Sequence, residues 1–381
     1  MLPRYYAFLE AEARILAEAV IQDPSQLSNL IKLKIGTILI RIFYGYYVKT
    51  DNDPFLILIR ASLNIFSSTA VSGVWLVDSI PFLKHLPTWL PGNGSLATAK
   101  RWRDVTWKAV WAPYAWSKRS FESGTVALPN TCAMALDIMD GELPAELEEQ
   151  LVWATGTMTA GGLETSIIGT LNFFLAMMLN PVVQAKAKQE IDSVVGRDRL
   201  PTISDKSSLP YVRSVVTEVL RLNPPIPLGA AHALSRDDIY EGMHLPKGSI
   251  VLANILHMLH DPEVFAHPMN FDPDRFRNLD SEMQKVTNVV FGFGRRQCPG
   301  KSLAENTVFA IAATVLATCE ILPNVDKDGR DIIPSVVYSS GMFRFPSRFE
   351  CNIRLRSDKG NDLLTQSIDE VPGISPVQSS V

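Results

Sequence analysis

A long apolar stretch between Pro144 and Pro181 determines what kind of core this chain can build. The stretch reads AELEEQLVWATGTMTAGGLETSIIGTLNFFLAMMLN. A proline at each end suits one continuous helix that begins after the first proline and ends before the second. At about 1.5 Å per residue, such a helix would cross the whole body of a domain. Its acidic start and apolar length therefore predict a long, central, buried helix.

The middle of this helix departs from the pattern of a buried helix. Gly156, Gly161 and Gly162 each cost roughly 1 kcal/mol relative to alanine. Glu164 is a lone carboxylate in a segment that is otherwise uncharged. Departures of this kind concentrate at functional sites, so we expect a functional site beside Glu164.

The rest of the chain is also mainly helical up to about residue 222. Helical patterns cover residues 182–195 and 211–222, and an earlier helix carries Trp102, Trp107, Trp111 and Trp116. Short strand patterns and coil follow Pro224, then an apolar helix over residues 303–320 and β segments to residue 356. The polar, Pro/Ser-rich residues 357–381 are predicted to be disordered. The predicted fold class is mainly α with a small β portion.

The composition excludes several classes of protein. The 381 residues carry a formal net charge of −4, which gives no basic field for binding nucleic acid. The four cysteines are scattered without a CxxC pair, so neither a structural zinc site nor a disulfide framework is expected. Charged residues occur throughout the first 20 residues, so these do not form the continuous apolar run of an anchor. The uncharged run 167–179 is shorter than the roughly 18 residues that cross a bilayer. We expect no transmembrane anchor in this chain.

One cysteine, Cys298, lies in the glycine-rich segment FGFGRRQCPG immediately before a predicted helix. A helix N-terminus and the neighbouring Arg295 and Arg296 stabilise a thiolate, which makes it a good metal ligand. A single thiolate cannot complete a tetrahedral zinc site, but it can be the proximal ligand of a haem iron. The alternative is a buried structural cysteine in a glycine-rich loop.

The same segment resembles the haem-binding signature of cytochrome P450 monooxygenases, Phe-x-x-Gly-x-Arg-x-Cys-x-Gly. Every fixed position is present, at Phe291, Gly294, Arg296, Cys298 and Gly300. Other landmarks of the family follow in its order: an oxygen-binding motif in GGLETS, a Glu-x-x-Arg pair in EVLR and a Pro-x-Arg-Phe element in PDRF. The resemblance implies a single fold over residues 1–356 with a long central helix and a cysteine-ligand loop before the last long helix. It also implies a haem cofactor held by the thiolate of Cys298.

The resemblance assigns a structural triad to Glu218, Arg221 and Arg275. By spacing alone, Glu218 and Arg221 share a helix face, and a solvated surface pair is the alternative. In the family the two join the arginine of the Pro-x-Arg-Phe element, here Arg275, in a buried network that locks the loop leading to the cysteine.

The resemblance assigns the oxygen chemistry to Glu164 and Thr165. A hydroxyl and an acid beside a locally opened helix would organise a water relay that delivers protons, and Gly161 and Gly162 would provide the room. A capping or packing threonine is the alternative.

Further cofactor contacts are implied at Arg296 and His232, as partners of the haem propionates, and at Phe291, Gly292 and Gly300 of the cysteine loop. For His232 a purely structural role is the alternative. The regions that match the family's substrate pocket are Met158 and Ala160, residues 226–230 and residues 339–342. Their apolar or small side chains favour a hydrophobic substrate, such as a terpenoid, steroid, aromatic hydrocarbon or fatty acyl chain.

The leading functional hypothesis is therefore a haem-thiolate monooxygenase of secondary metabolism. The resemblance implies a monomer that receives electrons from an NADPH-dependent reductase at the cytosolic face of the endoplasmic reticulum membrane. Segments that precede the fourth helix in the family have no counterpart here, so the chain is expected to be an N-terminally shortened member. Two alternatives stay open: a haem-thiolate isomerase or dehydratase that needs no O2, and a non-catalytic member without stable haem.

Overall fold

The computed structural model of the chain describes residues 2–69, 73–87, 94–126 and 128–365. These residues are mainly helical, and their strands form one three-stranded and two two-stranded sheets. The predicted fold class is confirmed. The chain divides into two compact units. Unit 1 contains the residues before Ala13 and the segment Gln26–Ile167, and unit 2 contains Ala13–Ser25 and Ile168–Leu364.

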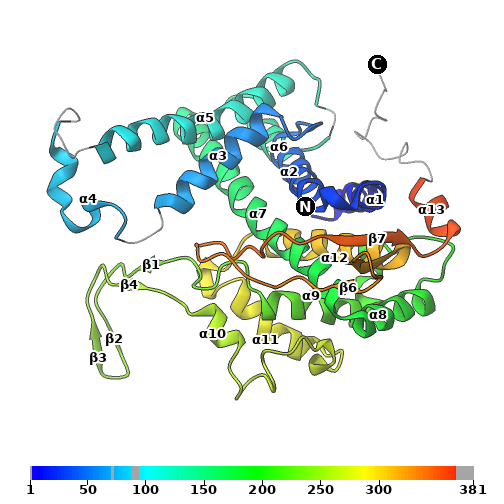
Figure 1. Cartoon of the computed structure of the whole chain (residues 1–381). Helices are drawn as coiled ribbons and strands as arrows, with labels where there is room; N and C mark the ends of the chain where they lie inside the picture. The colour runs from blue at the N-terminus through cyan, green and yellow to red at the C-terminus, as the bar shows by residue number, and fades with distance from the viewer. Residues whose placement is uncertain (1, 70–72, 88–93, 127, 366–381) are drawn as a thin grey trace. The chain divides into compact units, whose positions relative to one another are not determined.

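Unit 1 is built only from helices among the described residues. Its elements are η1 (Leu2–Tyr5), α2 (Leu27–Tyr44), α3 (Pro54–Thr69), α4 (Leu76–Ser79), η3 (Pro81–His85), α5 (Gly94–Glu122) and α6 (Thr131–Ile138). The helix α1 (Tyr6–Gln22) begins in unit 1 and continues into unit 2, and η2 (Pro24–Gln26) leads back into unit 1. Figure 1 shows α3 lying beside α5, and α2 contacts both α5 and α6. The predicted tryptophan-rich helix is α5, in which Trp107 stacks on Trp111 with ring centroids 5.4 Å apart.

The turn after α2 depends on Gly45, which has a φ of +76°. Its N–H donates to the carbonyl of Arg41 at 2.8 Å and so ends the helix in a left-handed cap. Asp53 then opens α3, because its carboxylate accepts the backbone N–H groups of Phe55 and Leu56 at 2.9 and 3.2 Å. Asp53 also accepts the hydroxyl of Tyr46 at 2.7 Å, so the segment between α2 and α3 is fixed at both ends.

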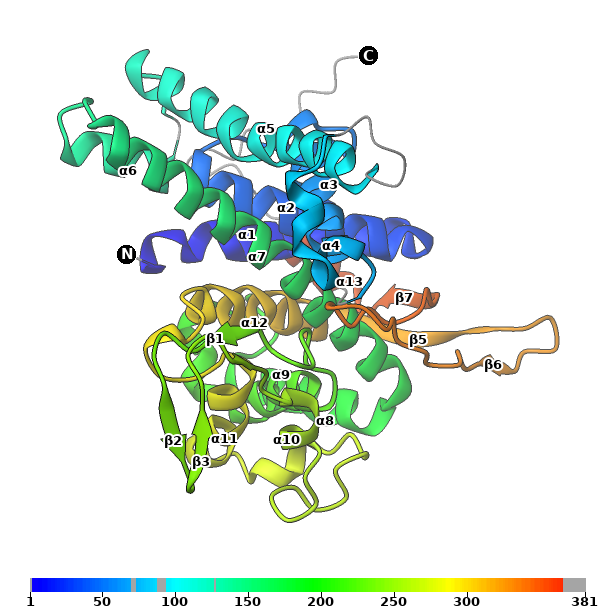
Figure 2. The same cartoon turned by 90° about the vertical axis from the view of Figure 1, so that its left-hand side faces the viewer.

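Unit 2 carries the remaining helices and all described strands. Its elements are α8 (Pro181–Val194), η4 (Ile203–Ser208), α9 (Pro210–Leu222), β1 (His232–Ala233), β2 (Asp238–Tyr240), β3 (Met243–Leu245), β4 (Ile250–Val251), α10 (Ile255–Leu259), η5 (Pro273–Phe276), α11 (Asp280–Val290), η6 (Gly294–Arg296), α12 (Lys301–Thr318), β5 (Cys319–Val325), β6 (Asp331–Ile332), β7 (Cys351–Leu355) and α13 (Asp358–Thr365). Figure 2 shows α9, α10 and α11 grouped together. They enclose a core of Ile255, Leu259, Phe265, Phe276, Met283 and Val286.

The long helix predicted between Pro144 and Pro181 is α7 (Ala145–Leu179), and it is continuous. Its first part belongs to unit 1 and its last part to unit 2. The helix does not open at Gly161 and Gly162, so the expected local opening is wrong for this structure. Among the described helices, α7 alone is long and apolar enough to cross a membrane, and 72% of its most apolar window is buried. That burial agrees with a core helix.

The three-stranded sheet has the antiparallel order β6-β5-β7. β6 pairs with β5 only at Asn324 and Val325. Earlier on β5, the side chain of Gln184 from α8 accepts the N–H of Ile321 at 2.9 Å and donates to its carbonyl at 2.8 Å. A buried amide thus takes the place of a neighbouring strand.

The segment after β7 differs from the sequence-based expectation. Asp358–Thr365 forms α13, so the prediction of disorder is wrong for these residues. Leu363 and Leu364 are buried, and Gly360 packs close to Thr318 of α12. The prediction failed because only two leucines form the apolar face of this short helix, and the residues around them are mostly polar. The remaining residues of the predicted tail, 366–381, lie outside the described part of the chain.

Candidate active site

The loop that carries Cys298 joins α11 to α12 through the short helix η6. The Cys298 N–H donates to the carbonyl of Phe291 at 2.7 Å, which closes the loop on itself. Cys298 is exposed, whereas Cys132, Cys319 and Cys351 are buried. The reading of Cys298 as a buried structural cysteine is therefore wrong. Its position just before Lys301, the first residue of α12, places the thiol near the N-terminal end of an 18-residue helix.

Two glycines give this loop its shape. Gly292 and Gly294 have φ values of +77° and +56°, a region that strains any other L-residue. A Cβ on Gly300 would lie 3.7 Å from the Cys298 sulfur, so glycine leaves that side of the sulfur open. Phe291 is buried beneath the loop, and the Lys301 ammonium lies 5.7 Å from the centre of its ring. The loop thus presents one accessible sulfur on a fixed backbone.

The basic residues of the loop remain available to an outside ligand. Arg295 and Arg296 are exposed. His232, on β1 opposite Val251, is exposed as well. The described residues contain no group of three or more His, Cys, Asp or Glu side chains that could hold a metal ion. His260, which has metal-ligand spacing from His257 in the sequence, instead places its Nε2 3.0 Å from the carbonyl of Leu222.

Unit 2 brings Glu218, Arg221 and Arg275 together. Arg221 donates from Nε to Glu218 Oε2 at 2.7 Å and from Nη2 to Oε1 at 2.9 Å. Arg275 donates from Nε to the same Oε1 at 3.0 Å. The Glu218 and Arg221 side chains are 0% exposed and that of Arg275 is 8% exposed. This burial rules out the solvated surface pair that the i, i+3 spacing also allowed.

The remaining donors of the two arginines hold a long irregular segment. Arg221 donates to the carbonyls of Leu259 and Asn270 at 2.8 and 3.2 Å. Arg275 donates to the carbonyls of Ala266 and Asn270 at 2.7 and 3.0 Å. Five donors in a rigid fork suit such a network. These backbone acceptors could not be found from sequence, because loop carbonyls carry no residue signature.

Glu164 and Thr165 lie on the part of α7 that belongs to unit 1. Burial raises the pKa of Glu164, and the charges of Arg60 and Lys32 partly oppose that rise. The Thr165 hydroxyl donates to the Gly161 carbonyl at 2.8 Å, a bond back to the preceding turn. Gly161 has open space around it, while a Cβ on Gly162 would lie 3.1 Å from a methyl carbon of Leu39.

Two of the predicted substrate regions meet in unit 2. The N–H of Arg344, just after residues 339–342, donates to the carbonyl of Pro225 at 2.9 Å, just before residues 226–230. Leu228 is half exposed within this region. Met158 and Ala160 are partly buried on the unit 1 part of α7. The arrangement presents apolar side chains beside a backbone contact that fixes both loops.

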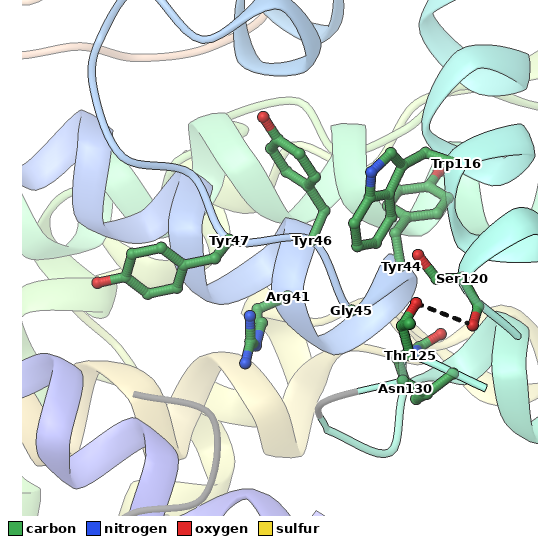
Figure 3. A pocket seen from close by; sticks show the side chains of 10 residues that line it. Arg41, Tyr44, Gly45, Tyr46, Tyr47, Trp116, Ser120, Thr125 and Asn130 are labelled. Carbon is green, nitrogen blue, oxygen red and sulfur yellow. Dashed lines mark hydrogen bonds between the residues drawn. The ribbon is translucent and has the colours of Figure 1, made fainter. Parts of the chain in front are cut away.

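Unit 1 contains a cavity of about 280 Å³ that the sequence did not reveal. We refer to it as the Arg41 pocket. It is lined by residues around the end of α2 and the end of α5, as Figure 3 shows: Arg41, Tyr44, Gly45, Tyr46, Tyr47, Trp116, Ser120, Thr125, Val126 and Asn130. The signal in the sequence that could have indicated this pocket is the cluster of tyrosines around Gly45. None of the predicted site residues lines this pocket.

An accessible cysteine thiol at the start of a helix can be the single protein ligand of a haem iron. The sequence matches the family model described as cytochrome P450 over residues 4–345. The chain belongs to the cytochrome P450 family. Family and fold together imply a haem cofactor ligated by a cysteine thiolate.

The relatives found by comparison agree with this assignment. The chain is 50% identical over 364 residues to cytochrome P450 monooxygenase 105 of Postia placenta, covering 96% of this chain and 70% of that protein. It is 47% identical over 371 residues to cytochrome P450 monooxygenase 226 of the same fungus, covering 97% and 70%. A solved structure of a zebra fish cytochrome P450 with progesterone superposes with a TM-score of 0.71 at 23% identity, covering 92% of this chain and 77% of that one. The chain is accordingly an oxidoreductase of the monooxygenase type.

The residues of the cysteine loop fit a haem. The accessible sulfur of Cys298, the open side left by Gly300 and the exposed Arg296 would suit a flat, anionic cofactor held by a single thiolate. No second metal-ligating side chain is needed for this coordination.

Proposed function

We propose that this chain is a haem-thiolate monooxygenase in which the Cys298 thiolate would hold the haem iron. The observation that carries the proposal is the accessible Cys298 thiol at the start of α12, in a chain whose other cysteines are buried. Haem supplies the activation of O2, a chemistry that side chains lack. Arg296 and His232 would bind the propionates, and Phe291, Gly292 and Gly300 would shape the contact surface.

Glu164 and Thr165 would hold and pass protons. Burial raises the pKa of Glu164, so the carboxyl keeps its proton to a higher pH than an exposed one. The proton of the Thr165 hydroxyl is engaged with the Gly161 carbonyl, which leaves its lone pairs to accept from water. A proton passes on only when the hydroxyl exchanges that bond for one to water. The pair would thus act as a relay rather than as ligands.

The substrate would be a hydrophobic small molecule, such as a terpenoid, steroid, aromatic hydrocarbon or fatty acyl chain, into which one atom of O2 is inserted. The apolar side chains of Leu228 and Met342, on the two loops joined by the Arg344–Pro225 backbone bond, support this class. Electrons would come from NADPH through a reductase, for which the exposed Arg295 offers a basic contact. We further propose a monomer at the cytosolic face of the endoplasmic reticulum membrane.

The experiment that tests the proposal is the absorbance spectrum of the reduced, CO-bound protein. The purified chain should show the Soret band of thiolate-ligated haem, and Cys298→Ser should lose it. Cys351→Ala, which removes a buried cysteine of β7, should keep the band. An unchanged band in Cys298→Ser would refute the assignment of the ligand. Product formation that continues without O2 would instead support an isomerase or dehydratase, and no haem band in the parent chain would support a non-catalytic member.

A further inference from the structure

A hairpin in unit 2 places an arginine over a tyrosine. Within residues 338–346, Tyr338 pairs with Pro346 in an isolated antiparallel bridge. Because side chains alternate along an extended chain, Arg344, two residues before Pro346, lies on the same face as Tyr338. The Arg344 guanidinium lies 4.4 Å from the centre of the Tyr338 ring. An arginine that stacks on a ring in this way is held in place, so its donors keep a fixed direction.

One donor of Arg344 lacks an acceptor. The residue as a whole is partly exposed, but its Nη1 is buried and has no hydrogen-bond partner among the described residues. Burial lowers the pKa of Arg344, and the Tyr338 phenol partly opposes that effect, whereas no carboxylate of the described residues does so. A buried charged donor without an acceptor is costly, so an acceptor group bound beside Arg344 would stabilise the protein.

A second unpartnered donor adjoins the same tyrosine. The Tyr338 hydroxyl donates to Oδ1 of Asn172 at 3.0 Å. Asn172 lies on the part of α7 that belongs to unit 2, and it is 2% exposed. Its Nδ2 is buried and has no hydrogen-bond partner in the part of the chain that the structure describes. Two donors from different elements, one on the hairpin and one on α7, therefore adjoin one aromatic side chain.

The hairpin is tied to the loop that follows α9. The N–H of Arg344 donates to the carbonyl of Pro225 at 2.9 Å. Leu228, three residues further along that loop, is 50% exposed, and Met342 on the hairpin is partly exposed. Apolar side chains and the unpartnered donors of Arg344 and Asn172 thus occur on neighbouring segments of one unit. This combination suits a ligand with an apolar body and one acceptor end.

We propose that Arg344 and Asn172 bind a carboxylate of the substrate, so that the chain oxidises apolar acids. The inference rests on the proposed function and narrows its substrate class to fatty, terpenoid or aromatic acids. Nη1 and Nδ2 can only donate, so they select an acceptor and exclude an ammonium group. A guanidinium binds a carboxylate more strongly than a neutral carbonyl or hydroxyl, because both partners are charged. A hydrocarbon would leave both donors unpaired.

Equilibrium dialysis of the purified chain tests the inference with two matched pairs of probes. The pairs are decanoate with decanamide, and 1-naphthoate with 1-naphthamide. At least one acid should bind about tenfold or more tightly than its amide, because the amide lacks the charge that pairs with Arg344. If neither acid binds better than its amide, the two donors bind no more than water and the proposal is wrong.

The outcome is separable from that of the proposed function, because dialysis does not require haem. The CO spectrum of the same sample reports the haem. A haem band without a preference for either acid overturns this inference alone. A preference for an acid without a haem band supports the carboxylate site and overturns the proposed function.

Two variants locate the binding. Arg344→Gln removes the charge and should lower the affinity for the preferred acid about tenfold or more, while the affinity for its amide changes about threefold or less. Asn172→Asp is nearly isosteric, and its carboxylate still accepts the Tyr338 hydroxyl but repels an acid. It should cause the same selective loss even where Arg344→Gln fails to fold.

Arg348→Gln is the matched control and should bind both pairs of probes as the parent does. Arg348 is exposed, and its ion pair with Glu350, at 3.8 Å, joins two exposed side chains. An undiminished preference for the acid in a folded Arg344→Gln or Asn172→Asp variant would place the carboxylate elsewhere and overturn the proposal.

Discussion

Arg275 donates to Glu218 at 3.0 Å although 57 residues separate the two in the sequence. The same carboxylate oxygen also accepts the N–H of Asp272 at 3.0 Å and a donor of Arg221. One buried oxygen thus ties α9 to the segment around η5. Because Glu218 is fully buried, the free energy of this network depends on every member being present.

Glu218→Ala should destabilise the chain strongly, because it leaves two buried guanidinium groups without their carboxylate. We expect a loss of about 3–5 kcal/mol in the free energy of unfolding, and loss of haem incorporation. Urea denaturation followed by circular dichroism measures the first, and the haem spectrum of the purified variant measures the second. A variant that purifies with normal haem content would contradict the role given to the triad.

Lys186→Ala is the matched control for that loss. Lys186 forms an ion pair with Asp274, which lies next to Arg275 in the sequence, but both side chains are about half exposed. Exposed pairs contribute roughly 0–1 kcal/mol. The variant should therefore unfold within about 1 kcal/mol of the parent and keep its haem.

Thr165→Ala should uncouple electron consumption from substrate oxidation, because it removes the hydroxyl of the proposed relay. Peroxide released per NADPH consumed should rise severalfold with a reductase supplied. Thr159→Ala is the control on the same helix, since Thr159 makes the same bond back to the preceding turn, to Thr155 at 2.7 Å. If both variants released the same amount of peroxide as the parent, Thr165 would be a packing residue.

Glu164 should make stability depend on pH. Burial raises its pKa above the usual value of 4.5, so the folded state holds the proton more tightly than the unfolded state does. Its contribution is therefore fully present below about pH 4.5 and is lost as the pH rises through the raised pKa. The difference in unfolding free energy between Glu164→Gln and the parent should grow over that window in favour of the variant. Parallel curves for the two proteins from pH 4 to 8 would contradict the raised pKa.

Gly45→Ala should destabilise the chain by about 3 kcal/mol. The left-handed conformation at Gly45 costs an L-residue about 1–2 kcal/mol, and the added Cβ would lie 2.5 Å from Asn130 Nδ2. Gly124 has a similar φ of +68° with nothing within 4 Å of its Cβ, so Gly124→Ala should cost only about 1–2 kcal/mol. Thermal unfolding of both variants measures the difference, and equal costs would mean that Asn130 moves aside freely.

Elements with a strong local signal could be predicted from the sequence. Pro144 before the helix and Pro181 after it set the bounds of α7. The helix predicted over residues 211–222 is α9, which begins one residue earlier at Pro210. The helix predicted over residues 303–320 is α12, which begins and ends two residues earlier. Periodicity and helix-breaking residues act over a few positions, so the helices that they define can be predicted without knowledge of the tertiary structure.

Features that depend on distant contacts could not be predicted in the same way. Spacing placed Glu218 and Arg221 on one helix face but left their burial open, and only the family resemblance joined Arg275 to them. The helix α13 buries Leu363 and Leu364, and its Gly360 lies close to Thr318 of α12. The Arg41 pocket depends on residues from two helices and the turns that follow them, which no local pattern brings together.

The Gln184 amide has a consequence for the behaviour of this protein at high concentration. An exposed strand edge is a template on which another chain can add by backbone pairing, and such addition starts aggregation. Gln184 saturates both backbone groups of Ile321 from within the same chain, and it is 3% exposed. The first half of β5 is thereby closed to edge-to-edge association, by a single side chain rather than by an additional strand.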